Sequence, residues 1–264
     1  MSLRLTILGC GSSGGVPRIG AMWGKCDPEN PRNRRRRCAL LVERRGPGGT
    51  TSVLVDTPPD LREQLLSVRA NALDAVLFTH DHADHTHGID DLRMVAYGMK
   101  RRVPCYFDAM TQSSIVGRFA YCFVQPEGST YPPILSAELL RPGEPVRIEG
   151  AGGPIEAIPI KQLHGDIETL GFRFGSVAYS PDISALPPDS VPLLENLDVW
   201  IVDALRYTPH PSHFSVKQAL EHIERLGARR AVLTHMTGDL DYATLKRELP
   251  AHVEPAYDNM VIEV

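Results

Sequence analysis

Residues 78–90 read FTHDHADHTHGID and place four histidines and three aspartates within thirteen positions. The apolar run Leu73–Phe78 leads into them and has the length of a buried strand. Side chains that leave a strand end on a short loop can converge on one point. Imidazoles and carboxylates bind divalent metals well, and without a cation their lone pairs and like charges would face each other. This stretch therefore predicts a metal site, with candidate ligands His80, His82, Asp84 and His85.

Four residues on one loop cannot enclose two metals, so further ligands are expected at other strand ends. Three polar residues follow apolar runs and complete the count: His164, Asp182 and His235. One metal is then assigned to His80, His82, His164 and Asp182. The other is assigned to Asp84, His85, His235 and the same Asp182. The endings Phe-Thr-His and Leu-Thr-His, at His80 and His235, suggest equivalent strands in two similar halves.

The hydrophobic pattern predicts alternating strands and helices without a repeat or a long linker, and we expect one domain over residues 1–264. Strands are expected at about 3–8, 38–43, 52–56, 74–78, 104–107, 155–160, 170–174, 176–179, 199–202, 230–233 and 260–263. Helices are expected near 59–69, 88–99, 109–121, 214–226 and 241–248. This order favours sheets covered by helices over an all-β barrel. The Pro/Gly-rich stretches 124–133 and 141–154 are expected to be surface loops around the site.

Composition narrows the function classes. No run approaches about 18 apolar residues and the N-terminus lacks a signal-peptide layout, so we expect a cytoplasmic protein without a membrane span. Five cysteines without CxxC spacing indicate neither a disulfide framework nor a cysteine zinc site. A net charge of −4 argues against a stable nucleic-acid complex. The basic run Arg34, Arg35, Arg36 and Arg37 is either a solvated loop or a contact for phosphates near the site.

One motif is discounted. Residues 9–14, GCGSSG, match the dinucleotide fingerprint G-x-G-x-x-G after a strand. Gly15-Val16-Pro17 follows where a helix should begin, and no acidic residue ends a second strand at the expected distance. A glycine-rich turn that brings backbone close to the site is the better interpretation.

The segment from His80 to His85 matches the signature His-x-His-x-Asp-His, and the chain resembles the metallo-β-lactamase superfamily. His164, Asp182 and His235 fit that family's order, and Asp56 resembles its early strand-end aspartate. The resemblance covers nearly the whole chain. It implies an αββα sandwich of two mixed sheets flanked by helices, with two divalent metal ions, zinc or manganese, at one edge between the sheets. Asp56 is expected to orient a ligand.

Within that superfamily, the chain is similar to the PhnP-type phosphodiesterases, which act on cyclic phosphate diesters, and to the transfer-RNA 3′-end nucleases. The opening LTILGCGSSGGVP, the Arg-rich segment before Cys38, and His213 carry this resemblance. PhnP also holds a structural zinc through a cysteine cluster and a later histidine. This chain offers only Cys26 in that region and has Gly238 in place of the histidine, so that zinc is expected to be absent.

The site predicts a phosphodiesterase that cleaves a small cyclic or nucleotide-like diester. Two cations can share a water, lower its pKa and clamp the phosphoryl oxygens while a bridging hydroxide attacks. The departing alkoxide needs a proton, and His213, just before a predicted capping box at Ser215, is the candidate donor. His213 and the ligand Asp84 are assigned to catalysis.

Two other classes stay open. The same fold supports a thioesterase or lactonase, which needs no phosphate clamp, and a non-hydrolytic metal-binding protein. No inserted arm with basic flanks is evident, so a small phosphodiester or nucleotide is favoured over folded RNA. A homodimer is left open.

Overall fold

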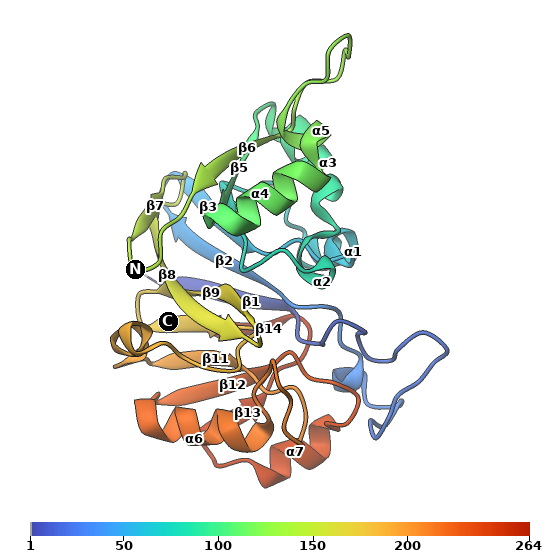
Figure 1. Cartoon of the computed structure of the whole chain (residues 1–264), viewed down its shortest axis with the longest axis vertical. Helices are drawn as coiled ribbons and strands as arrows, with labels where there is room; N and C mark the ends of the chain where they lie inside the picture. The colour runs from blue at the N-terminus through green and yellow to red at the C-terminus, as the bar shows by residue number, and fades with distance from the viewer. Residues whose placement is uncertain (1) are drawn as a thin grey trace.

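The computed structural model describes residues 2–264 as two seven-stranded sheets stacked face to face, with helices on both outer faces (Figure 1). The first sheet has the order β14 (Met260–Glu263), β1 (Leu3–Gly9), β2 (Ala39–Gly46), β3 (Gly49–Val55), β4 (Ala75–Leu77), β5 (Val103–Phe107), β6 (Leu135–Leu139). The second has the order β13 (Val253–Pro255), β12 (Arg230–Thr234), β11 (Val199–Asp203), β10 (Val177–Ser180), β9 (Ile167–Phe174), β8 (Ile155–His164), β7 (Val146–Ile148). The expected αββα sandwich is confirmed.

Seven α-helices among the described residues cover the sheets. Five lie on the first sheet's side: α1 (Leu61–Val68), α2 (Ala83–Thr86), α3 (Leu92–Met99), α4 (Ala109–Arg118) and α5 (Ala120–Phe123). Two lie on the second sheet's side, α6 (Val216–Leu226) and α7 (Tyr242–Glu248) (Figure 1). The predicted capping box of α6 is present, because Ser215 accepts from the Gln218 amide and the Gln218 side chain accepts in return. This local motif fixes where α6 begins.

Two apolar clusters hold these layers together. The larger one extends from the space between the sheets to the residues of α6 and α7 that pack on the second sheet, and it includes the fully buried Trp200, Tyr179 and Phe172. The second lies between the first sheet and its helices, where Phe78 stacks on Phe107 at 4.8 Å between ring centroids. Strands packed on both faces are buried along their whole length, as in β4, which is entirely apolar, and β10, where Ser180 follows three apolar residues. Polar side chains therefore gather where these strands end.

The two sheets repeat one topology, as the expectation of two similar halves requires. From the β14 edge of the first sheet and the β7 edge of the second, three antiparallel pairings are followed by three parallel ones. The proposed equivalence of His80 and His235 is wrong, however. The first sheet is counted from β14 and the second from β7. The strand before His80, β4, then stands fifth, and the strand before His235, β12, stands sixth. The position that matches β4 is that of β11, which ends in Asp203.

Some elements differ from the expectations. Three strands were not predicted, β6, β7 and β13, and all lie at or next to a sheet edge, where short, partly exposed strands carry a weak pattern. The expected loop 141–154 contains β7, and Ala83–Thr86 form a short helix instead of a loop. Residues 124–133 do form a loop, which projects beyond α5 and away from α2 (Figure 1).

The arginine run is part of the framework. Arg35 is 2% exposed, and its guanidinium donates to the carbonyls of Thr237 at 2.9 Å and Leu240 at 2.6 Å. Its Nη1 also lies 3.8 Å from the Cys26 sulfur. Arg36 pairs with Asp258, so the interpretation as one solvated loop is wrong. The buried guanidinium joins residues 26–35 to the segment that follows His235.

Replacing Arg35 tests this role. Arg35→Met is expected to destabilise the chain by about 2–5 kcal/mol, because it leaves two buried carbonyls without a donor. The exposed Arg34, whose guanidinium lies 5.5 Å from the Trp23 ring, provides the matched control. Arg34→Met should cost about 1 kcal/mol or less. Urea unfolding of both variants measures the difference, and equal midpoints would contradict a structural role for Arg35.

Candidate metal centre

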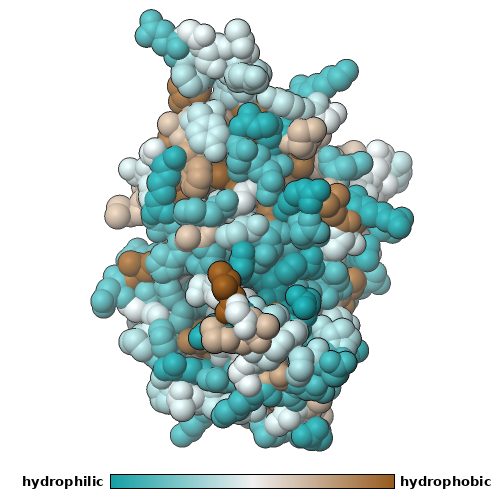
Figure 2. Space-filling model, turned by 90° about the vertical axis from the view of Figure 1, so that its right-hand side faces the viewer, coloured by the Kyte–Doolittle hydropathy of each residue, from teal (hydrophilic) through white to brown (hydrophobic). Residues whose placement is uncertain are grey.

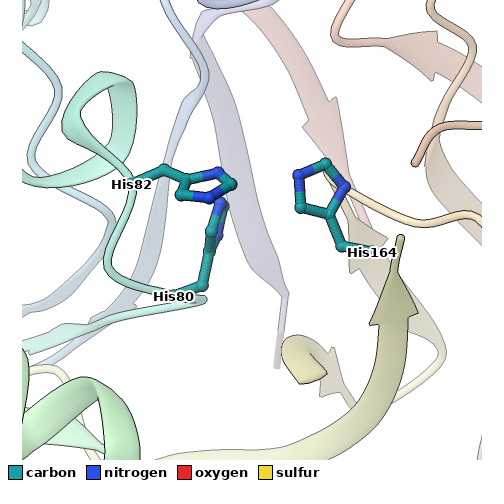
Figure 3. Close-up of side chains that lie close together, drawn as sticks. All are labelled: His80, His82 and His164. Carbon is teal, nitrogen blue, oxygen red and sulfur yellow. The ribbon is translucent and has the colours of Figure 1, made fainter. Parts of the chain in front are cut away.

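The seven predicted ligands converge at the edge between the two sheets. They come from the loop after β4 and helix α2, from the end of β8, and from the segments after β10 and β12. Figure 3 shows His80, His82 and His164 turning their rings toward one gap. Ligand atoms of these three lie within 4.8 Å of one another, and those of Asp84, His85 and His235 form a second such group. The structure thus brings together both sets assigned from the sequence.

Asp182 lies between the two groups. Its carboxylate is 3.1 Å from His85 Nε2 and 3.5 Å from His235 Nε2. It is also 3.9 Å from His80 Nε2 and 3.8 Å from His164 Nε2. Since one carboxylate faces histidines of both groups, the geometry suits an aspartate that bridges two cations.

The outer nitrogens of His80, His85 and His164 are held by protein oxygens, which leaves Nε2 of each facing inward. His85 Nδ1 lies 2.7 Å from Asp56 Oδ2, and His164 Nδ1 donates to the Ser212 carbonyl at 2.6 Å. His80 Nδ1 lies 2.9 Å from Thr79 Oγ1. Since the Thr79 hydroxyl donates to Asp56, it accepts from His80. These contacts select the tautomer whose Nε2 lone pair can bind a metal.

Asp56 is fully buried and contacts the outer nitrogen of His85, the position that its expected role in orienting a ligand requires. Besides His85, its carboxylate accepts from the amide and the hydroxyl of Thr79 at 2.8 Å each. Its backbone φ of +65° is the left-handed conformation, which turns the chain at the end of β3.

Asp56→Asn keeps the shape of the side chain but weakens its hydrogen bond to His85. We expect metal affinity to fall by about 10–100-fold, as measured by competition with a chelator. Unchanged affinity would remove Asp56 from the metal centre.

In the described part of the chain, the centre combines buried carboxylates with histidine nitrogens that lack hydrogen-bond partners, an arrangement that a bound cation would stabilise. Within residues 2–264, His80 Nε2, His85 Nε2, His235 Nε2 and Asp182 Oδ1 are buried without a hydrogen bond of good geometry. Burial disfavours a charged His85, yet the carboxylates of Asp182, Asp84 and Asp56 raise its pKa well above the usual value. Burial likewise opposes protonation of His235, but Asp182 and its other acidic neighbours raise its pKa to about 9. Bound divalent metals would satisfy the orphaned atoms and the carboxylates together, so the residues fit a metal pair.

His213 lies next to this cluster and contacts a carboxylate that is not one of the seven predicted ligands. Its Nδ1 lies 2.7 Å from Asp203 Oδ2, and its ring stacks on that of His235 at 4.6 Å. Its ring is also 4.5 Å from that of His164. Burial, followed by the nearby His235, lowers the pKa of His213 to about 4. The Asp203 contact leaves Nε2 as the nitrogen that can meet a substrate.

Asp203 was missed from the sequence, although it ends the predicted strand 199–202 just as Asp56 ends another. It is fully buried, and its Oδ2 also accepts from the Ile183 amide at 3.1 Å, next to Asp182. Burial raises its pKa well above the usual value. Thr79 was also missed, because a threonine before a histidine carries no signal of its own.

Other candidates lie outside the cluster. Asp81 accepts from Ser114 and pairs with Arg118. His87 is exposed, with its ring 5.5 Å from that of Phe119. Arg93 pairs with Asp90 at 2.5 Å, which is the structural alternative to a phosphate contact. The glycine-rich turn reaches the centre through its backbone, because Met236 donates to the Cys10 carbonyl and Ser12 donates to that of Met236.

A model of the beta-lactamase superfamily domain matches residues 51–236, which include every predicted ligand. The chain belongs to the beta-lactamase superfamily. A crystal structure described as a new diphosphatase from the PhnP family matches 100% of this chain and 98% of its own, with 34% sequence identity and a TM-score of 0.87. The similarity to the PhnP group is thereby confirmed for this superfamily member.

More distant structures share the fold. Zn²⁺-bound PqqB from Methylobacterium extorquens is 16% identical with a TM-score of 0.76, covering 99% of this chain and 100% of that one. The short form of human tRNase Z is 19% identical with a TM-score of 0.65, covering 98% of each. The superfamily and its hydrolase members support a metal-dependent hydrolase.

A curated octanoyltransferase from Porphyromonas gingivalis (strain ATCC BAA-308 / W83) is 31% identical over 265 residues, 98% of this chain and 51% of that protein. The chain thus spans about half the length of this relative. Within residues 2–264, the structure has no helix with the length and hydrophobicity that a membrane crossing requires.

Proposed function

We propose that this superfamily member is a phosphodiesterase that uses two divalent metals to cleave a small phosphate diester. The observation that carries the proposal is His213, a histidine held by its own buried carboxylate beside a cluster that already has seven candidate ligands. Thioester cleavage has less need of such a group, because a thiolate leaves without a proton, whereas the poor alkoxide leaving group of a phosphodiester needs one. The full-length similarity to a PhnP-family diphosphatase supports phosphorus chemistry.

The residues divide the work as follows. The two histidine groups and Asp182 would hold the metals, which when bound supply Lewis acidity and an acidified water. Asp84 and His85 would belong to the second metal. His213 would place a proton near the ester oxygen that leaves, and Asp203 would keep its Nδ1 occupied. An anionic substrate would favour the protonated imidazole, against the effect of burial.

A second candidate is hydrolysis of an acyl thioester. It is favoured by the octanoyltransferase relative, although the match covers only about half of that protein. It would use the same metals but would not need His213 as a donor. The two candidates therefore differ in how much activity they lose when His213 is replaced.

One substrate panel separates these functions. The metal-loaded chain is assayed on bis(p-nitrophenyl) phosphate, a 2′,3′-cyclic nucleotide, a diphosphate-linked dinucleotide and an octanoyl thioester. We expect turnover of the phosphodiesters at least about 100-fold above that of a His80→Ala variant, because the variant lacks a ligand of one metal. Preferred turnover of the thioester would replace the proposal by the second candidate. Preferred turnover of the dinucleotide would change the proposed activity to hydrolysis of diphosphate bonds.

A further inference from the structure

A pocket of about 910 Å³ opens beside the metal centre, between α4 and the strands β8 and β9. His80 contributes to both the cluster and the pocket wall. In Figure 3, α4 in green and β8 in olive stand on either side of the gap that the three histidines face. The pocket floor is attached to the centre, because Thr169 donates to the Asp182 carbonyl and Leu170 to that of Thr79. A group bound here would therefore lie next to the reacting bond.

Most of the charged groups in the wall are paired, including Arg141 with Glu144, and the remaining Asp166 is itself negative. Lys161 forms an ion pair with Glu168. Asp108 caps α4 by accepting from the Thr111 amide at 2.7 Å, which occupies that helix N-terminus. Asp81 is engaged by Arg118. These paired groups leave little to attract a second phosphate, so the wall favours an uncharged group.

The rim of the pocket is apolar. Met110 is 83% exposed, Leu139 52% and Ile167 38%, although large apolar side chains gain by being covered. Beneath them lie the buried Leu140 and Leu170. Among the described residues that line the pocket, none is phenylalanine, tyrosine or tryptophan. A nucleobase is commonly held by stacking on such rings, so the lining suits an aliphatic group better than a base.

We propose that this pocket, named here the aliphatic pocket, binds a non-aromatic hydrocarbon group of the substrate. The inference rests on the proposed phosphodiesterase function and narrows its substrate class to diesters that carry an alkyl or similar aliphatic chain on the alcohol that is not released. The metals hold the phosphate, and the chain extends over Leu139 and Ile167. Specificity then comes from the length of the chain.

A series of p-nitrophenyl alkyl phosphates with methyl, butyl and octyl chains tests this with a constant leaving group. We expect kcat/KM to rise by up to about fourfold for each methylene that is fully buried. For the butyl and octyl esters, kcat/KM should exceed the value for thymidine 5′-(p-nitrophenyl phosphate). No dependence on chain length, or a preference for the thymidine ester over the octyl ester, would overturn the inference.

Variants locate the effect. Leu139→Asp and Ile167→Asp place a charge on the rim and should flatten the dependence of kcat/KM on chain length. Leu66→Asp, at a side chain 57% exposed on α1, is the matched control and should keep the full dependence. Equal chain-length dependence in all three variants would place the chain elsewhere and overturn the inference.

A binding measurement separates this inference from the proposed function. Calorimetric titration with octyl phosphate and methyl phosphate should show tighter binding of the octyl compound and a negative heat-capacity change, both lost in Leu139→Asp. This result can hold even if no phosphodiester is turned over, in which case the proposed function fails and the pocket stands. Equal affinity for the two compounds, with turnover of the methyl ester, would leave the function and overturn the pocket.

Discussion

Asp182→Ala is expected to lower the metal content from about two ions per chain and to reduce the rate of hydrolysis by more than about 100-fold. This loss is larger than the loss of about 10–100-fold expected when a residue that only hydrogen-bonds to a metal ligand is replaced. Its carboxylate faces four histidines from both groups, so its loss weakens both sites at once. Elemental analysis after purification without chelator, followed by assays with added Zn²⁺ or Mn²⁺, measures both effects and shows which ion restores activity.

His235→Ala is the comparison for that experiment. It lies in the second group only, so it should lower the content toward one ion per chain and leave the site of His80, His82 and His164. A native stoichiometry near one, with metal content unaffected in His235→Ala, would contradict the assignment of two metals. Equal loss in both variants would show that the two ions bind only together.

His213→Ala is expected to keep both metals and to lower kcat by about 10²–10⁴-fold, the range that a positioned proton donor contributes. The loss should be smaller on a p-nitrophenyl ester than on a ribose or alkyl ester, because p-nitrophenolate leaves without a proton. Asp203→Asn should share part of this pattern, since it alters the group that holds His213 Nδ1.

His210→Ala is the matched control, because its ring lies 5.3 Å from that of His213 without a contact to Asp203 in the described structure. Its turnover should stay close to that of the parent. Loss of metal in His213→Ala would make His213 a ligand, a role that its proximity to His164 and Asp182 allows. Equal losses on both kinds of ester would make it a phosphate-binding residue, with the proton supplied elsewhere.

An exposed loop of residues 17–30 distinguishes one side of the molecule. The loop of residues 17–30 projects from the side of the molecule that Figure 2 views, where an apolar projection stands out from a mainly hydrophilic face. Ile19 in this loop is 97% exposed. Arg35 anchors the base of the loop to the segment after His235. The Arg35→Met variant, whose stability is measured by urea unfolding, can also be assayed for turnover to test whether this anchoring affects activity.

The sequence by itself determined the features that are local in the chain. His80, His82, Asp84 and His85 lie within six positions at a strand end, so short-range geometry brings them together. The capping box at Ser215 defines the start of α6 for the same reason. Apolar runs followed by His164, Asp182 and His235 indicated strand ends, because buried strands release polar side chains only where they leave the core.

Only the tertiary structure decided which distant groups meet. Asp203 meets the Ile183 amide and lies 3.8 Å from His235 Nδ1, because β11 lies between β10 and β12 and strand order depends on pairings far apart in sequence. The same dependence made the Phe-Thr-His and Leu-Thr-His endings misleading, since β4 matches β11 and not β12. The buried position of Arg35 depends on carbonyls about 200 residues further along the chain. A charged side chain in a basic run carries no sign of such partners, because the free energy of burying it is set by what the folded chain places around it.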